Sequence, residues 1–108
     1  MHRFKPDFIA MVTYALPTQG GRTQPVHSGY QPIIRFEDCG FAAPAENVLT
    51  DREQLSLGET AEVNITMESI DMFSNSLLVG QKFDIYEPPR WVGAGFIKKI
   101  VNKDLEKA

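Results

Sequence analysis

The fold is decided by Arg90-Trp91-Val92-Gly93-Ala94-Gly95-Phe96-Ile97-Lys98-Lys99-Ile100. Its aromatic and β-branched side chains favour a strand, which we place at Trp91–Val101. Gly93 and Gly95 interrupt the larger residues, and glycine inside a strand indicates a bulge or a close approach by a neighbouring backbone. If Val92 faces the core, strand alternation turns Trp91 outward. The stretch therefore predicts a bent strand with an outward indole near its start.

Outward from this stretch, the chain shows short β-rich segments separated by turn residues. Further strands are expected at Phe8–Leu16, Tyr30–Phe36, Glu46–Leu49, Glu59–Met67 and Leu77–Tyr86. The clearest alternation places Ala61, Val63, Ile65 and Met67 on one face. The intervening segments are expected to be loops: Thr18–Gly29 with a tight turn at Gly20-Gly21, Glu37–Ala45, Asp51–Gly58 and Glu68–Ser76. Short strands without a convincing amphipathic helix predict an all-β barrel or sandwich, and closing the sheet would remove exposed edges.

Length and composition indicate one domain. The chain has 108 residues, is 43% hydrophobic and carries a net charge of −3, so its overall charge does not attract nucleic acid. We expect a single barrel domain over residues 1–108, with the barrel at about 5–101 and a charged C-terminal tail at 102–108. The single cysteine, Cys39, excludes an intramolecular disulfide, and the sequence shows neither an export signal nor a membrane-length apolar run. We therefore expect a cytoplasmic protein that does not bind a membrane.

An ordered set of motifs carries a resemblance to a known family. Gly20-Gly21-Arg22 is followed by Gly29-Tyr30-Gln31-Pro32, then by Leu55-Ser56-Leu57-Gly58-Glu59-Thr60-Ala61, and finally by Arg90-Trp91-Val92-Gly93-Ala94-Gly95. In this order the motifs resemble the C-terminal β-barrel, domain 3, of the elongation factor Tu family, over roughly Lys5 to Val101. The resemblance implies a six-stranded antiparallel closed β-barrel that acts as a binding module, with no GTPase domain in this chain.

The resemblance also implies partners. In the family this domain contacts aminoacyl-tRNA, the GTPase domain and the exchange factor Ts. Ile33 and Pro88-Pro89 depart from the family pattern and weaken a tRNA contact, because proline offers no backbone N–H to a phosphate. We therefore expect a protein partner, which would be a translation factor or its ligand, or a separately encoded GTPase subunit, and tRNA binding stays open as an alternative.

The candidate partner-binding residues are Arg22, Tyr30, Pro88, Pro89, Arg90 and Trp91. Arginine offers a rigid fork of donors to a partner, but Arg22 and Arg90 could equally pair with a carboxylate between loops. Trp91 could contact a partner or pack on a neighbouring loop.

The chain lacks the sequence motifs of nucleotide hydrolysis, since it contains neither a phosphate-binding loop nor Asn-Lys-x-Asp. We predict no catalytic residue, no cofactor and no metal site. Two alternatives to a translation-factor-like module stay open. One is a decoy or immunity-type protein that binds a toxin or partner of elongation factor Tu. The other is a small hydrolase using His27 or Cys39, for which no supporting motif is found.

Overall fold

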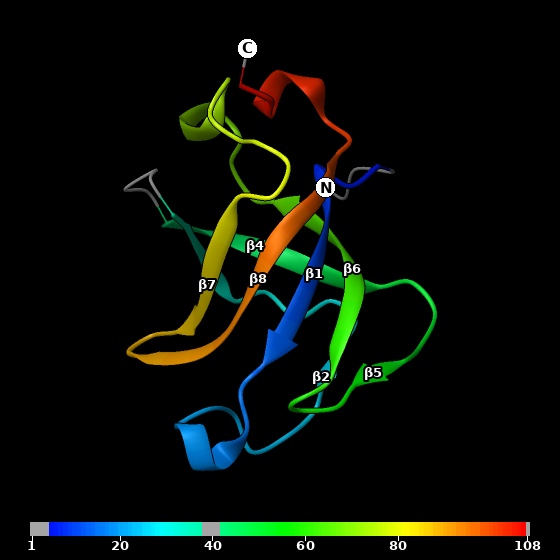
Figure 1. The fold of residues 1–108 in the computed structure, drawn as a ribbon, viewed down its shortest axis with the longest axis vertical. Helices are drawn as coiled ribbons and strands as arrows, with labels where there is room; N and C mark the ends of the chain where they lie inside the picture. Colours follow the sequence, from blue (N-terminus) through cyan, green and yellow to red (C-terminus); the bar gives the residue numbers. More distant parts are fainter. Residues whose placement is uncertain (1–4, 38–41, 108) are drawn as a thin grey trace.

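Six strands form a closed antiparallel barrel in the computed structural model, which describes residues 5–37 and 42–107 (Figure 1). The order around the barrel is β1, β6, β4, β3, β7, β8, and β8 closes it by pairing with β1. The strands are β1 (Phe8–Tyr14), β2 (Val26–His27), β3 (Ile33–Phe36), β4 (Ala42–Leu49), β5 (Gln54–Leu55), β6 (Thr60–Met67), β7 (Lys82–Glu87) and β8 (Arg90–Ile100). Single 3-10 turns are η1 (Pro17–Gln19), η2 (Asp71–Phe73) and η3 (Lys103–Leu105). The predicted all-β, six-stranded closed barrel is confirmed.

Alternating apolar side chains fill the barrel. The alternation predicted for β6 is confirmed, because its four predicted inward residues are buried. At the centre, the ring of Phe36 makes edge-to-face contacts with Phe8, Phe73 and Phe83, at centroid distances of 5.8, 5.4 and 5.7 Å. Burying each such side chain stabilises the fold by roughly 1.5–3 kcal/mol. The core therefore joins strands that are distant in sequence.

Glycines in β8 allow its neighbours to approach closely, as the sequence predicts. A Cβ at Gly95 would lie 2.5 Å from the carbonyl oxygen of Met11 and 2.9 Å from the ring of Phe83. Between β7 and β8 the register shifts, so that Val92 is an extra residue between two cross-strand pairs. Because of this extra residue, Val92 and Gly93 are both buried, whereas Trp91 before them pairs with Tyr86 and Ala94 after them pairs with the exposed Asp84.

Several predicted boundaries are wrong. β4 begins at Ala42, within a segment that is expected to be irregular because alanine and proline have low strand propensity. In the structure the alanines at 43 and 45 are small inward side chains, and Pro44 pairs with Ile33 of β3. β3 begins at Ile33 rather than Tyr30, and β7 begins at Lys82 rather than Leu77. The segments Thr18–Gly29 and Asp51–Gly58, both expected to be loops, contribute one strand each, β2 and β5, to a separate two-stranded sheet.

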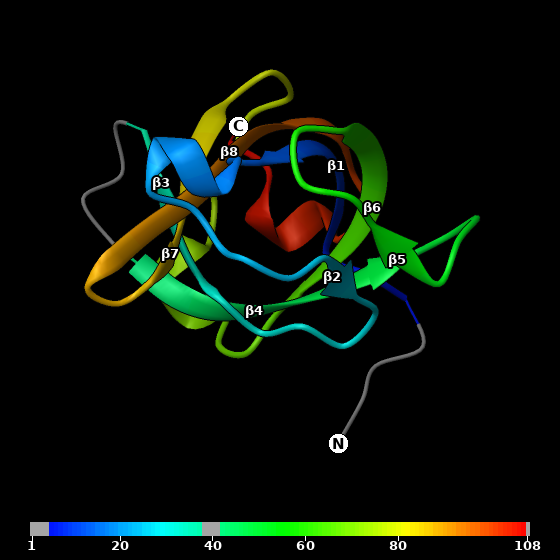
Figure 2. The same cartoon turned by 90° about the horizontal axis from the view of Figure 1, so that it is seen from below.

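The C-terminal segment packs on one end of the barrel rather than forming a free charged tail. Leu105 is fully buried, and its carbonyl accepts hydrogen bonds from the backbone N–H groups of Ser76 and Leu77, at 3.0 and 2.8 Å. In Figure 2, η3 lies within the ring of strands. Leu105, the one large apolar residue of this charged segment, therefore packs at the end of the barrel. Within the described residues, no helix has the length and apolarity needed to cross a membrane.

Candidate binding site on the β7–β8 hairpin

The turn before Arg22 is shaped by two glycines with different roles. Gly20 ends η1 in the left-handed conformation, with φ of 87°. Gly21 has no positive φ, but a Cβ there would collide with the backbone of Ala15, 2.8 Å from its carbonyl carbon. The predicted tight turn is therefore present, with positive φ supplied by Gly20 and a close backbone approach permitted by Gly21. Together they direct the chain so that Arg22 reaches the β7–β8 hairpin.

Arg22, Tyr30 and Glu87 form a compact polar group, which we call the Glu87 cluster. The carboxylate of Glu87 accepts hydrogen bonds from the Arg22 guanidinium and the Tyr30 hydroxyl. The Arg22 guanidinium also lies 4.5 Å from the Tyr30 ring centroid. Its other nitrogens donate to the carbonyls of Gln24 and Pro25, at 3.2 and 3.4 Å. The donors of Arg22 are thus used within the chain, which is the carboxylate pairing that the sequence left open.

Burial and hydrogen bonding shift the titration of this cluster. Burial opposes ionisation of Glu87, but hydrogen bonds from Tyr30 and Arg22 outweigh it, so the pKa of Glu87 lies below its ordinary value. Burial, together with the hydrogen bond to Glu87, raises the pKa of Tyr30 above its usual range. Burial also raises the pKa of Tyr14, whose ring packs edge-to-face on Tyr30 at 5.7 Å. At neutral pH the Glu87 cluster holds one carboxylate, one guanidinium and one neutral phenol, and the adjacent Tyr14 phenol is neutral as well.

The cluster continues into the barrel through Tyr14. Its hydroxyl donates to the Oδ1 atom of buried Asn47, at 2.8 Å, and the Asn47 amide donates to the carbonyl of Ala45, at 3.2 Å. Glu87 is therefore linked, through rings and hydrogen bonds, to Tyr14 of β1 and Asn47 of β4. This chain of contacts fixes the base of the β7–β8 hairpin.

The other candidate residues, Pro88, Pro89, Arg90 and Trp91, are exposed on the same hairpin. Val92 is fully buried and Trp91 is 38% exposed, which confirms the predicted outward orientation. The Trp91 indole N–H donates to Asp84 Oδ1 at 3.0 Å, so the exposed ring has a fixed orientation. Among residues 5–37 and 42–107, no ion pair of Arg90 is seen. The six sequence-predicted residues thus divide into a fixed pair, Arg22 and Tyr30, and an exposed set.

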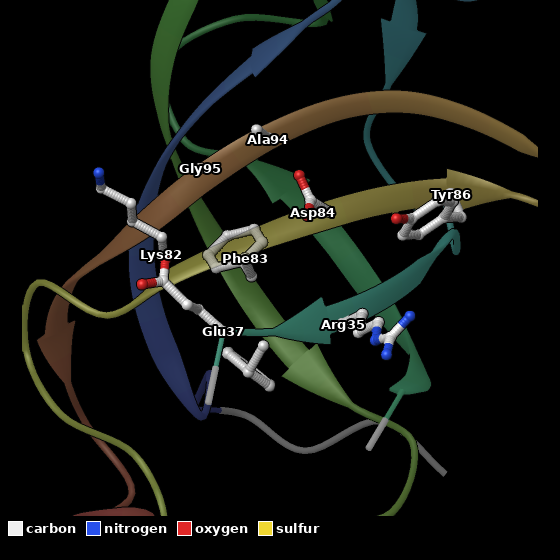
Figure 3. A pocket seen from close by; sticks show the side chains of 9 residues that line it. Arg35, Glu37, Lys82, Phe83, Asp84, Tyr86, Ala94 and Gly95 are labelled. Atoms are coloured by element: carbon white, nitrogen blue, oxygen red, sulfur yellow. The ribbon is translucent and has the colours of Figure 1, made fainter. Parts of the chain in front are cut away.

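A groove of about 390 Å³ lies on the outer wall formed by β3, β7 and β8, and one of its lining residues is Asp84, which accepts the hydrogen bond from the Trp91 indole. Figure 3 shows Arg35 and Tyr86 at one end, Lys82 and Glu37 at the other, and Asp84 between them. Ala94 and Gly95 of β8 contribute its small residues. Charged and aromatic side chains therefore surround a part of the wall where β8 carries little bulk.

Sequence reasoning missed Glu87 and the groove. The alternation of β7 could have indicated the groove, because inward Phe83 and Ile85 place Lys82, Asp84 and Tyr86 on the outer face. The role of Glu87 had no local signal, since its partner Arg22 is 65 residues away along the chain.

Of the two residues considered for hydrolysis, only His27 lies in the described part of the chain. His27 is exposed on β2 and lies outside the groove, and the neighbouring Ser28 hydroxyl accepts a hydrogen bond from the Leu49 N–H at 2.8 Å. Cys39, the other residue considered, lies outside the described residues. Across the described parts of the chain, no group of three or more His, Cys, Asp or Glu side chains is placed to hold a metal ion. A scan against models of known protein families finds none that matches this chain.

Proposed function

We propose that this barrel is a non-catalytic binding module that contacts a protein partner through Pro88, Pro89, Arg90 and Trp91. The observation that carries the proposal is Trp91, a large aromatic side chain that is 38% exposed and is held in one orientation by Asp84. Tryptophan and arginine are enriched among residues that dominate protein–protein binding energy. An exposed tryptophan beside an exposed arginine, on a stiff Pro-Pro turn, is suited to that role.

The Glu87 cluster supports the proposal by fixing the hairpin. Glu87 directly precedes Pro88, and both Arg22 and Tyr30 hold its carboxylate. A surface that is already ordered loses less conformational entropy on binding. In this proposal Arg22 and Tyr30 position the hairpin, and the partner touches the residues that follow Glu87.

Two features favour a protein over RNA as the partner. Pro88 and Pro89 supply no backbone N–H to a phosphate, and the guanidinium of Arg22 is already occupied by Glu87. The setting in translation rests on the order of motifs that resembles domain 3 of elongation factor Tu. The proposed partner is accordingly a translation factor, a ligand of one, or a separately encoded GTPase subunit.

The test is affinity capture from a native extract with the tagged chain, compared with Trp91→Ala and with a matched control, Leu78→Ala. Leu78 is also exposed, at 48%, and lies beyond the opposite end of β7. We expect at least one protein to be retained by the wild type and by Leu78→Ala, and to be depleted at least tenfold with Trp91→Ala.

Identical capture by all three proteins would contradict the proposal. A mobility shift with tRNA at low salt that disappears as salt is raised would indicate a phosphate-driven contact instead.

A further inference from the structure

The segment Lys103–Lys107, which we call the strap, is paired with the loop that precedes β7. The carbonyls of Asp104 and Leu105 accept hydrogen bonds from the backbone N–H groups of Asn75 and Leu77, at 2.9 and 2.8 Å. Another bond runs back from the strap to the Leu77 carbonyl at 2.8 Å, and the two segments form an isolated parallel β-bridge. The loop therefore holds the strap by main-chain pairing, in the way that a sheet holds an added strand.

One side chain anchors the strap. Leu105 is fully buried, and it belongs to the same apolar cluster as Phe73 and Leu77. The other side chains of the strap are half-buried or exposed, and they are those of Lys103, Asp104, Glu106 and Lys107. We call the loop residues Phe73–Leu77 the seat. The seat thus recognises a short segment by its backbone and by a single leucine.

The barrel closes without the strap. β8 ends at Ile100, and the barrel strands form a closed ring that does not include the strap. Just before the strap, the carbonyl of Asp7 accepts hydrogen bonds from the N–H groups of Val101 and Asn102, at 3.0 and 2.9 Å. These contacts fix the chain up to Asn102 independently of the seat. Because the strap itself adds one buried side chain and a few backbone bonds, it should open at a lower free energy than the barrel unfolds.

We propose that the strap is exchangeable: it opens beyond Asn102 while the barrel stays folded, and the seat then takes the strap of a second copy of the chain. The second strap carries the same leucine and the same backbone groups, so exchange replaces each contact between strap and seat with an identical one. Reciprocal exchange uses the same surface on both copies and gives a symmetric dimer. The seat lies before β7 and the proposed Trp91 contact lies after it, so the two surfaces are at opposite ends of the barrel (Figure 1).

Amide hydrogen exchange of the wild-type chain tests the opening. The N–H groups of Asn75 and Leu77 donate to the strap, whereas the N–H of Val101 donates to Asp7 on the barrel side of the hinge. We expect the first two to exchange at least a hundredfold faster than Val101, relative to their unfolded-state rates. Equal protection would show that the strap opens only when the barrel unfolds, and would overturn the inference.

A peptide supplied in trans tests the seat. The probe is a fluorescein-labelled, amidated peptide of residues 101–107, titrated into the whole chain carrying Leu105→Ala, whose own strap lacks its anchor. We expect a saturable rise in fluorescence anisotropy. Binding should be at least tenfold weaker to the wild type, whose seat is filled, and equally weak to Lys103→Ala, which changes an exposed strap residue.

A second probe, with alanine in place of the leucine, should bind Leu105→Ala at least tenfold more weakly. Equal binding of the two probes, or no binding of either, would contradict the inference. Far-UV circular dichroism verifies that Leu105→Ala is folded. If it is unfolded, Asn102→Ala replaces it in the same titration, because that change removes the bond to Asp7 and the cap on the Asp104 N–H but keeps the leucine.

Sedimentation equilibrium tests the second copy as the occupant. We expect the wild type to form a dimer as its concentration rises, and Leu105→Ala to stay monomeric at the same concentrations. A wild type that stays monomeric, or a dimer that Leu105→Ala retains, would rule out exchange of the strap. Trp91→Ala should leave the dimer unchanged, so this result and the extract capture fail independently.

Discussion

The two arginine-bearing turns look alike in the sequence but differ in the folded barrel. Arg22 follows Gly20-Gly21, and its guanidinium is held by Glu87, by two carbonyls and by the ring of Tyr30. Arg90 follows Pro88-Pro89 and is exposed at the start of β8. Glu87 accounts for the difference. It lies in the turn before Arg90, but its carboxylate binds Arg22 of the first turn. The comparison shows that an arginine in such a turn is structural when a nearby carboxylate binds it, and is available to a partner when the carboxylate binds a different arginine.

The burial of the Arg22–Glu87 pair determines how much more it should stabilise the fold than Arg90 does. The side chains of Arg22 and Glu87 are 20% and 38% exposed, so their pair lies between a surface ion pair and a buried one. Surface pairs contribute about 0–1 kcal/mol, whereas removing one partner of a buried pair costs about 3–5 kcal/mol. A stabilisation between these limits is expected for the Glu87 cluster, and almost none for Arg90.

The largest expected effect is at Gly21. Gly21→Ala should lower the free energy of unfolding by about 3 kcal/mol, because its Cβ would collide with the Ala15 backbone, which cannot move aside as a side chain can. Gly20→Ala is the matched control. It has a positive φ but open space around it, and should cost about 1–2 kcal/mol. Urea unfolding measures both, and equal losses would show that the close approach at Gly21 is unimportant.

Glu87→Gln should lower the free energy of unfolding by about 2 kcal/mol, since it leaves the partly buried Arg22 without its counter-charge. Arg90→Ala should change it by less than about 0.5 kcal/mol, as for an ordinary surface substitution. The same unfolding assay compares the two. A larger loss at Arg90 than at Glu87 would reverse the assignment of the two turns.

The effect of Glu87 should also depend on pH. Because the folded-state pKa of Glu87 is lowered, its contribution is fully present above the unfolded-state value of about 4.3 and is lost as the pH falls through the folded-state pKa. The stability difference between the wild type and Glu87→Gln should therefore be constant near pH 7 and shrink markedly by about pH 3. A difference that stays constant down to pH 3 would mean that the carboxylate charge does not stabilise the hairpin.

A small stability effect is also expected at Trp91. Trp91→Ala removes one hydrogen bond to Asp84 and a partly exposed ring, so it should cost no more than about 1 kcal/mol. Val92→Ala is the contrast, since Val92 is fully buried and its truncation should cost more. If Trp91→Ala unfolds the protein, the indole is part of the architecture.

Local pattern predicted much of the barrel. The alternation of apolar residues located β6, and the apolar segments located β1 and β8. The expectation that Val92 faces the core gave the correct outward orientation of Trp91. The start of β4 was missed because Ala42–Ala45 has little intrinsic strand preference and is ordered by pairing with β3. The docking of Leu105 was missed because one apolar residue in a charged segment gives no periodic signal.

The candidate site could be predicted only in part. Its exposed residues follow from turn composition and alternation, whereas the Glu87 cluster depends on barrel closure, which brings together residues 65 positions apart. The groove likewise depends on the cross-strand register that aligns Arg35, Asp84 and Ala94 on neighbouring strands.

The most direct test compares Arg22→Lys with Trp91→Ala in the same affinity capture from native extract. Arg22→Lys keeps the positive charge beside Glu87 but removes the guanidinium fork that a partner would read. If the Arg22 turn is architecture and the β7–β8 hairpin is the contact surface, Arg22→Lys retains the captured protein and Trp91→Ala loses it at least tenfold. Loss with Arg22→Lys and retention with Trp91→Ala would contradict this division of roles.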